Sequence, residues 1–318
     1  MSDISAKAED LTARGTGAVR MGHELCICVV SYGKHSLDFP TMLALQAESA
    51  QLAAARTMLL VWNNGPQSFS ADDVSTLIAS FPTSVHVVVQ NHLGNEPLSD
   101  VYNGVVRQVE ADRYCFLDDD SRPDGNYLNA ICSGTTADLI VPKIMSGGQQ
   151  HGPRVAARLM EEGVIAIAPA SGFFAVGSGL VLSRSLVDNL EREFGEAFDR
   201  AYAFYGVDTS LCIRLESLAL KQSITVCCVG NINHDLSRLS AGAGRNTFRR
   251  TERGWDLGIT LRRYPQWRFV KTAMAAIVRS LAGTGTISAR ALVSGYLAGA
   301  HPRSTAIKER KQRSKSDE

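Results

Sequence analysis

YCFLDDDSRPD, at Tyr114–Asp124, is the most informative stretch of this chain. Four mostly apolar residues run directly into three aspartates, which is typical of a buried strand that ends at a surface. In open α/β sheets, ligands bind at the carboxyl ends of the strands. Because alternate side chains of a strand share a face, Asp118 and Asp120 can converge while Asp119 points elsewhere. An acidic turn without a ligand is the competing interpretation, so the neighbouring segments must decide.

Three adjacent carboxylates repel one another, and a bound cation would allow them to stay charged. Mg²⁺ and Mn²⁺ prefer oxygen ligands, and they often use one or two carboxylates while leaving positions for phosphate oxygens. The triplet therefore suggests a Mg²⁺ or Mn²⁺ site that also receives a phosphate group.

The chain around the triplet alternates between short apolar runs and helical segments. Up to the aspartates, the pattern predicts strands at 25–30, 58–62, 85–90 and 114–117, separated by helices at 37–55, 71–80 and 99–110. Beyond them it predicts helices at 125–133 and 183–193, a helix opening at Asp208, and strands at 139–143, 164–168 and 223–229. Strands and helices in alternation, with short links, predict βαβ units and a mainly parallel, Rossmann-like sheet flanked by helices.

Composition is that of an ordinary globular protein, with 45% hydrophobic and 20% charged residues. The first strand is not followed by a G-x-G-x-x-G or P-loop signature, which argues against nicotinamide dehydrogenases and P-loop ATPases. The seven cysteines show no metal-binding spacing, so we expect them in the core of a protein from a reducing compartment. The first 20 residues contain no apolar signal-peptide region, and we therefore expect a cytoplasmic protein.

Six motifs follow one another at predicted strand ends and helix starts: VVSYGK, VWNNG, LDDDSRPD, SGLVLSR, FYGVDTSLCIR and NINHD. Their order resembles that of the inverting glycosyltransferases of family 2, which have the GT-A fold, and especially bacterial rhamnosyl- and galactofuranosyl-transferases. The resemblance covers about residues 25–236. It implies metal-dependent transfer of a sugar from a UDP- or dTDP-linked donor to a hydroxyl of a glycan or lipid-linked saccharide, in the synthesis of cell-surface polysaccharide.

The resemblance also assigns roles to individual residues. Those implied to bind the nucleotide are Ser31, Tyr32, Asn63, Asn91, Ser99, Asn103, Asp118 and Asp119. Asp118 and Asp120 would hold Mg²⁺ or Mn²⁺, and His234 would complete the metal site. Asp208 would be the general base, and its place near a helix N-terminus favours its ionised form.

This sequence departs from the family pattern in two places. Asn63 stands where the family often has an aspartate, which removes one charged contact to the base. The family often has a second acid near the catalytic one, whereas here Val207 precedes Asp208 and Ser210 follows two residues later. A single carboxylate must then act as base.

Two other functions remain open from sequence. A nucleotidyltransferase would need a basic glycine-rich loop after the first strand, and Ser31-Tyr32-Gly33-Lys34 is short for that purpose. A non-catalytic protein that binds a sugar nucleotide, or that acts as an adaptor at a membrane, would also fit the composition.

The C-terminal part differs in charge from the body. Residues 241–318 contain 16 Lys and Arg against 5 Asp and Glu, whereas residues 1–240 contain 17 against 27. Apolar residues at helical spacing predict a helix at 266–281, either packed on the body or lying on an anionic membrane at its inner face. No aromatic residues are interleaved with the basic ones, and we expect no nucleic-acid partner.

We therefore expect four regions in the chain. A loose lead-in at 1–22 precedes a GT-A catalytic domain at 23–240, and a basic helical extension at 241–305 leads to a disordered basic tail at 306–318. Neither the donor sugar nor the oligomeric state follows from these patterns.

Overall fold

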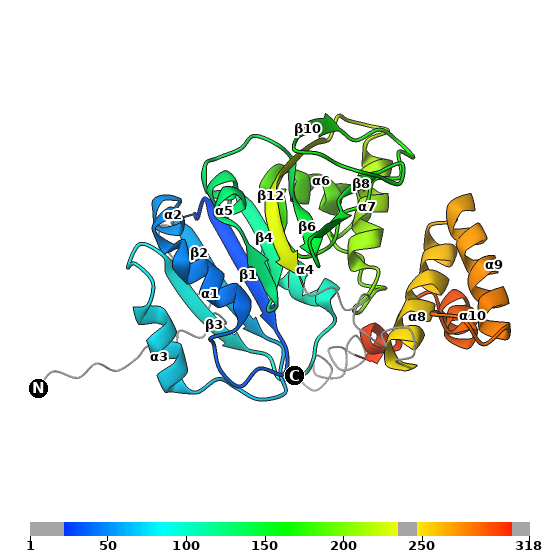
Figure 1. Cartoon of the computed structure of the whole chain (residues 1–318), viewed down its shortest axis with the longest axis horizontal. Helices are drawn as coiled ribbons and strands as arrows, with labels where there is room; N and C mark the ends of the chain where they lie inside the picture. The colour runs from blue at the N-terminus through cyan, green and yellow to red at the C-terminus, as the bar shows by residue number, and fades with distance from the viewer. Residues whose placement is uncertain (1–21, 235–246, 307–318) are drawn as a thin grey trace, which may run out of the picture.

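The computed structural model describes residues 22–234 and 247–306 (Figure 1). An α/β body holds the first range, and a helical unit, here called the C-terminal extension, holds the second. The expected lead-in, the junction at 235–246 and the tail beyond 306 lie outside the described residues.

The body is built on one mainly parallel sheet. Its central parallel strands are β1 (Leu25–Ser31), β2 (Thr57–Asn63), β3 (His86–Asn91) and β4 (Arg113–Asp118), in the spatial order β3-β2-β1-β4. Next to β4, the antiparallel strand β11 (Leu180–Ser183) joins this group to β6 (Leu139–Ser146) and β12 (Thr225–His234). Shorter strands extend or flank the sheet: β5 (Ser121–Pro123), β7 (Gln149–Gly152), β8 (Arg154–Val155), β9 (Arg158–Leu159) and β10 (Gly163–Ala166).

Helices cover both faces of the sheet, so its strands are buried on both sides. One face packs against α1 (Pro40–Ala47), α2 (Ser49–Ala54), α3 (Ala71–Ala79) and α5 (Gly125–Cys132). The other packs against α4 (Leu98–Gln108), α6 (Arg184–Phe194) and α7 (Val207–Leu218). Every residue of β1 is buried, and its side chains alternate between the two cores, which explains why its sequence is a continuous apolar run.

The predicted parallel α/β arrangement is confirmed, with two local differences. The helix expected at 37–55 is two helices, because Glu48 leaves helical geometry between α1 and α2. The carboxylate of Glu48 lies close to Gly125: a Cβ added at Gly125 would be 3.1 Å from Oε1 of Glu48. The second difference is β11, an antiparallel strand in a segment whose glycines and serines are typical of a loop. All seven cysteines are unpaired, and each is buried or half-buried, as predicted.

The C-terminal extension consists of α8 (Thr247–Arg263), α9 (Trp267–Leu281) and α10 (Ala289–Ala298). Glycines allow α8 and α10 to approach backbone to backbone. A Cβ added at Gly254 would lie 2.6 Å from the carbonyl oxygen of Ser288, and one at Gly258 would collide with the backbone of Leu292. The G-x-x-x-G spacing on α8 thus places both glycines on the face that meets α10.

A buried carboxylate fastens the extension to the body. Asp199, which is 1% exposed, accepts hydrogen bonds at Oδ2 from Arg263 Nε (2.8 Å) and from the hydroxyl of Tyr264 (2.7 Å). Arg214 of α7 lies 3.5 Å from the same oxygen. Burial alone would raise the pKa of Asp199, but Arg214, Tyr264 and Arg263 hold it below its ordinary value. The junction is therefore ionic at neutral pH.

We predict that Gly258→Ala destabilises the protein by about 2 kcal/mol, because the methyl group has no room against the backbone of α10. Thermal unfolding measures the effect. Gly94→Ala is the matched control, since nothing lies within 4 Å of an added Cβ at Gly94. Equal melting temperatures for the two variants would contradict the close packing of α8 on α10.

Candidate functional site

The aspartate turn lies at the carboxyl end of β4, as the sequence predicts, and hydroxyl groups fix its backbone. Thr41 Oγ1 donates to the carbonyl oxygen of Asp118 (2.5 Å) and accepts from the backbone N–H of Ser121 (3.0 Å). Ser178 Oγ accepts from the N–H of Asp118 (3.0 Å) and shares a hydrogen bond with Ser121 Oγ (2.6 Å). The turn is therefore held from α1 on one side and from the 177–179 segment on the other.

Asp119 fastens the loop after β1 to the turn. Its Oδ2 accepts the backbone N–H of Tyr32 (3.1 Å), and its Oδ1 lies 3.3 Å from Lys34 Nζ. Burial raises the pKa of Asp119, and the contacts with Tyr32 and Lys34 oppose this rise. This carboxylate therefore has a role within the protein, and its contact with the nucleotide stays a prediction.

Asp208 lies in the first turn of α7, as predicted. Gly206 precedes the helix in left-handed conformation, with φ of 83°. The carboxylate of Asp208 accepts backbone N–H groups from Thr209, at 2.7 Å, and from Gly177. Burial raises its pKa, these hydrogen bonds oppose the rise, and the charge of Asp118 adds to it.

The 177–178 segment connects the two carboxylate residues. Gly177 donates to Asp208, and the neighbouring Ser178 binds the backbone of Asp118. Asp118 and Asp208 are ninety positions apart in sequence, yet each contributes to raising the pKa of the buried Tyr102 hydroxyl. The end of β4 and the start of α7 thus form one acidic edge.

A third acid, Asp256 of α8, reaches this edge from the C-terminal extension, and sequence reasoning missed it. An added Cβ at Gly206 would collide with its carboxylate, so Asp256 lies against the start of α7. Burial, and then the charge of Asp208, raise the pKa of Asp256 to about 7. No local motif marks this residue, because its role depends on how α8 packs against α7.

The asparagines after β2 and β3 bind each other. Asn63 is fully buried, and its Nδ2 donates to Asn91 Oδ1 and to the carbonyl oxygen of Gln67, both at 2.7 Å. Its Oδ1 accepts the N–H of Gly65 (3.0 Å). Asn63 therefore fastens the turn, and its contact with the base stays a prediction. Asn91 is exposed at the strand end.

Ser99 and Asn103 hold the segment before α7. Both are buried on α4. Ser99 Oγ donates to the carbonyl oxygen of Tyr202 (2.5 Å), and the amide of Asn103 bonds both backbone groups of Phe198 (2.7 and 3.0 Å). These hydrogen bonds are made inside the protein, and the part of both residues in nucleotide binding stays a prediction.

Ser31 and Tyr32, at the end of β1, differ in exposure. Ser31 is fully buried, and its hydroxyl has no hydrogen-bond partner among the described residues. Tyr32 is 53% exposed, with its ring available to a ligand. Of the predicted nucleotide residues, Tyr32 and Asn91 are exposed, and Asp118 and Asp119 are half-buried.

The expected metal site rests on Asp118 and Asp120. No cluster of three or more His, Cys, Asp or Glu that could hold a metal occurs within residues 22–234 and 247–306. The backbone of His234 pairs with Ser121 in β12 and β5, next to the turn, but its side chain lies outside what the structure describes. Two carboxylates at one turn fit Mg²⁺ or Mn²⁺ if phosphate oxygens supply further ligands.

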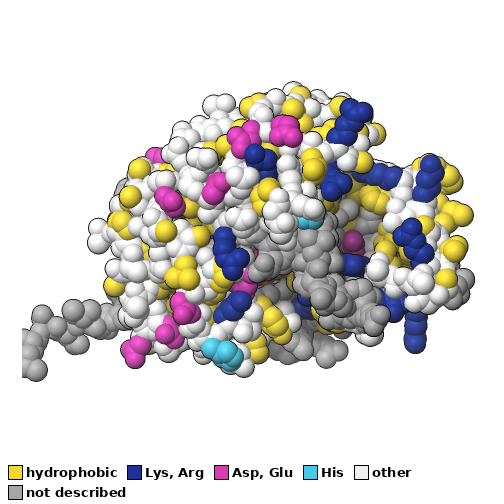
Figure 2. All heavy atoms as spheres, viewed as in Figure 1, with side chains coloured by type: hydrophobic (Ala, Val, Ile, Leu, Met, Phe, Trp, Pro, Cys, Tyr) yellow, Lys and Arg dark blue, Asp and Glu magenta, His cyan; other side chains and the backbone are white. Residues whose placement is uncertain are grey.

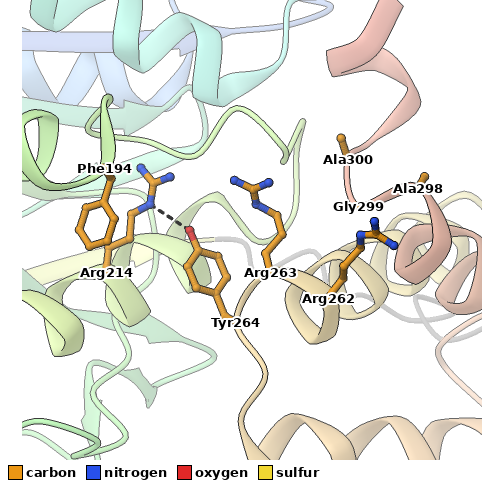
Figure 3. A pocket seen from close by; sticks show the side chains of 8 residues that line it. All are labelled: Phe194, Arg214, Arg262, Arg263, Tyr264, Ala298, Gly299 and Ala300. Atoms are coloured by element: carbon orange, nitrogen blue, oxygen red, sulfur yellow. Dashed lines mark hydrogen bonds between the residues drawn. The ribbon is translucent and has the colours of Figure 1, made fainter.

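A cavity of about 640 Å³ lies at the junction of body and extension, away from these acids (Figure 3). It is lined by Phe194, Arg214, Arg262, Arg263, Tyr264, Ala298, Gly299 and Ala300. Arg214 donates to Tyr264, Arg263 to Asp199, and Arg262 to the last carbonyl groups of α10. These arginines serve the junction, so we place the chemistry at the acidic edge instead.

Comparisons with known proteins agree with the fold. No family model and no curated protein sequence matches the chain. Among solved structures, S. aureus TarS 1–349 in complex with UDP-GlcNAc is 11% identical, with a TM-score of 0.50, over 88% of this chain and 93% of that one. A longer TarS structure is 10% identical, with a TM-score of 0.47, over 80% of this chain and only 42% of its own. The likeness to the structure in complex with UDP-GlcNAc confirms the predicted GT-A-type fold.

We predict that Asp256→Asn stabilises the protein more at pH 8 than at pH 5. The unfolded carboxyl ionises near its ordinary pKa of 3.8, whereas the folded one keeps its proton to about 7. Stability is thus lost as pH rises between these values, and the asparagine variant avoids that loss. Melting temperatures from pH 5 to 8 measure the difference.

Asp188→Asn is the control for the Asp256 experiment, because it makes the same change at a carboxylate that is 49% exposed on α6 and lies 3.8 Å from Arg184. The larger gain in melting temperature at pH 8 than at pH 5, expected for Asp256→Asn, should not appear in this control. A pH-independent effect of Asp256→Asn would contradict the raised pKa.

Proposed function

We propose that the protein is an inverting glycosyltransferase that moves a sugar from a nucleoside-diphosphate sugar to a hydroxyl group. The observation that carries this proposal is the pairing of Asp118 and Asp208 across the 177–178 segment, at the carboxyl edge of a GT-A-type sheet. Asp118 would act at the diphosphate of the donor, and Asp208 would act at the acceptor hydroxyl.

The donor would bind beside β1, β3 and β4. Tyr32 offers an exposed ring to the base, Asn91 an exposed amide, and Asp118 a carboxylate at the ribose and diphosphate. The fold likeness to a structure in complex with UDP-GlcNAc makes a UDP sugar the first donor to test. UDP-galactofuranose and dTDP-rhamnose are the next donors to test, because the sequence motifs resemble those of galactofuranosyl- and rhamnosyl-transferases.

Asp118 and Asp120 would hold a Mg²⁺ or Mn²⁺ ion together with the diphosphate, as we infer from their carboxylate oxygens and shared turn. When bound, the ion stabilises the negative charge that develops on the leaving diphosphate. The hydroxyls of Thr41 and Ser178 keep the turn in place for this role.

Asp208 would take the proton from the acceptor hydroxyl as it attacks the anomeric carbon. A general base is most effective when its pKa approaches the working pH, and burial raises that of Asp208. The N-terminus of α7 and two backbone N–H groups still favour the ionised form that accepts the proton. A single displacement with one base inverts the anomeric centre.

The acceptor would be a glycan or lipid-linked saccharide of the cell surface.

Neither alternative function gains support. The loop from Ser31 to Lys34, which a nucleotidyltransferase would use, is short and bound to Asp119. A non-catalytic module would not need a buried acid with a raised pKa beside Asp118.

We predict that Asp208→Asn lowers turnover at least about 100-fold while nucleotide binding is retained, because only the proton acceptor is removed. Release of the nucleoside diphosphate from a donor screen measures turnover, and calorimetry measures binding. Asp188→Asn, on the exposed face of α6, should retain full activity. Unchanged turnover in Asp208→Asn would eliminate this residue as the base.

We predict that Asp120→Ala removes the effect of Mn²⁺ on nucleotide affinity. In the parent protein, Mn²⁺ should tighten UDP binding about tenfold or more, because the ion neutralises charge between carboxylates and diphosphate. Calorimetric titration of UDP with and without Mn²⁺ tests this. If the variant keeps the same metal-dependent gain, the ion binds elsewhere.

A further inference from the structure

Helix α9 turns its large apolar side chains toward solvent. Trp267, Met274 and Val278 are 66%, 60% and 65% exposed, and their spacing of seven and four residues places them on one stripe. The residues buried on the opposite side, Ala273 and Ala276, are small. A surface helix normally buries its large apolar residues, as α9 does in part with Phe269, so an exposed stripe of three others is unusual.

The neighbouring helix α10 adds to the exposed apolar surface. Val293, Tyr296 and Leu297 are each about half exposed or more. Figure 2 shows hydrophobic and basic side chains gathered at the end of the molecule where Figure 1 draws α9. Several large apolar side chains exposed on neighbouring helices are typical of a site of contact with a partner or a membrane.

The charge of this region has one sign. Residues 257–308 contain eight Lys and Arg and no Asp or Glu. On α9, Lys271 Nζ lies over the Trp267 ring at 5.6 Å, and Arg279, which follows Val278 in the sequence, is exposed. Arg268 is the exception, because it pairs with Glu216 of the body at 2.9 Å.

We infer that the stripe of Trp267, Met274 and Val278, with Lys271 and Arg279 beside it, binds the surface of an anionic lipid bilayer. Apolar side chains enter the boundary between headgroups and acyl chains, while the basic ones meet the lipid phosphates. No helix in the described ranges is both long and apolar enough to cross a bilayer. The contact is therefore one that lies on the membrane.

Other occupants fit this surface less well. A second copy would bring two positive surfaces together without an acidic residue on either helix to pair them. Nucleic acid would use the basic residues but leave Met274, Val278 and Leu297 without a partner. An anionic bilayer satisfies both kinds of side chain.

The inference does not rest on sugar transfer, and a binding experiment tests it directly. Full-length protein is sedimented with vesicles of phosphatidylcholine alone, or of phosphatidylcholine with a quarter phosphatidylglycerol. We expect binding to the anionic vesicles, reduced by salt, and a decrease of about tenfold or more in the variant Trp267→Ser/Met274→Ser/Val278→Ser. Because the three side chains are exposed, the variant should fold normally, which circular dichroism checks.

Matched controls locate the contact. Leu43→Ser/Ile78→Ser removes similarly exposed apolar residues from α1 and α3 and should bind as the parent does. Lys271→Glu/Arg279→Glu should lose the preference for anionic vesicles. A chain ending at residue 306 should still bind, since the stripe is intact.

Three results would overturn the inference. They are absence of binding to anionic vesicles, full binding by the triple serine variant, and binding that disappears when residues 307–318 are removed. Light scattering without lipid provides a fourth: if the parent self-associates and the triple variant does not, the stripe is an interface between copies.

Discussion

The burial of neighbouring carboxylates is the constraint on which the candidate site depends. Burial raises the pKa of Asp208 and of Asp256, and the charges of Asp118 and Asp208, respectively, raise them further. Backbone N–H groups and the N-terminus of α7 offset part of that cost for Asp208. The 177–178 segment is central, because it supplies a donor to Asp208 and a hydroxyl to the backbone of Asp118. A site built in this way fits the cation and the proton acceptor of the proposed reaction.

Much of the body could be predicted because its signals are local. Apolar runs that end in turn residues place β1 to β4, and the three aspartates fall where parallel strands end. The roles of Asn63, Ser99 and Asn103 could not be predicted in the same way. A polar residue near a strand end can bind a ligand or fasten a neighbouring loop, and its partners lie far away in sequence. Only the folded chain shows that these side chains are already used.

Asp256 illustrates the opposite failure, in which a site residue carries no sequence signal. Its position requires α8 to lie against the start of α7, and that placement depends on distant contacts. Asp199 holds the end of α8 through Arg263 and Tyr264, while Gly254 and Gly258 let α10 pack closely behind it. The glycines were visible in the sequence, but nothing there indicated which helix they face. The position of Asp256 at the site therefore depends on long-range packing.

Two acids lie where the extension meets the body, Asp199 and Asp256, and they change charge in different pH ranges. Asp199 has a lowered pKa, so the junction stays ionic throughout the neutral range. Asp256 has a pKa of about 7, so its charge appears within that range. The charge of Asp208 is one cause of this raised pKa, after burial, so the C-terminal extension places an acid that titrates near neutral pH beside the proposed base.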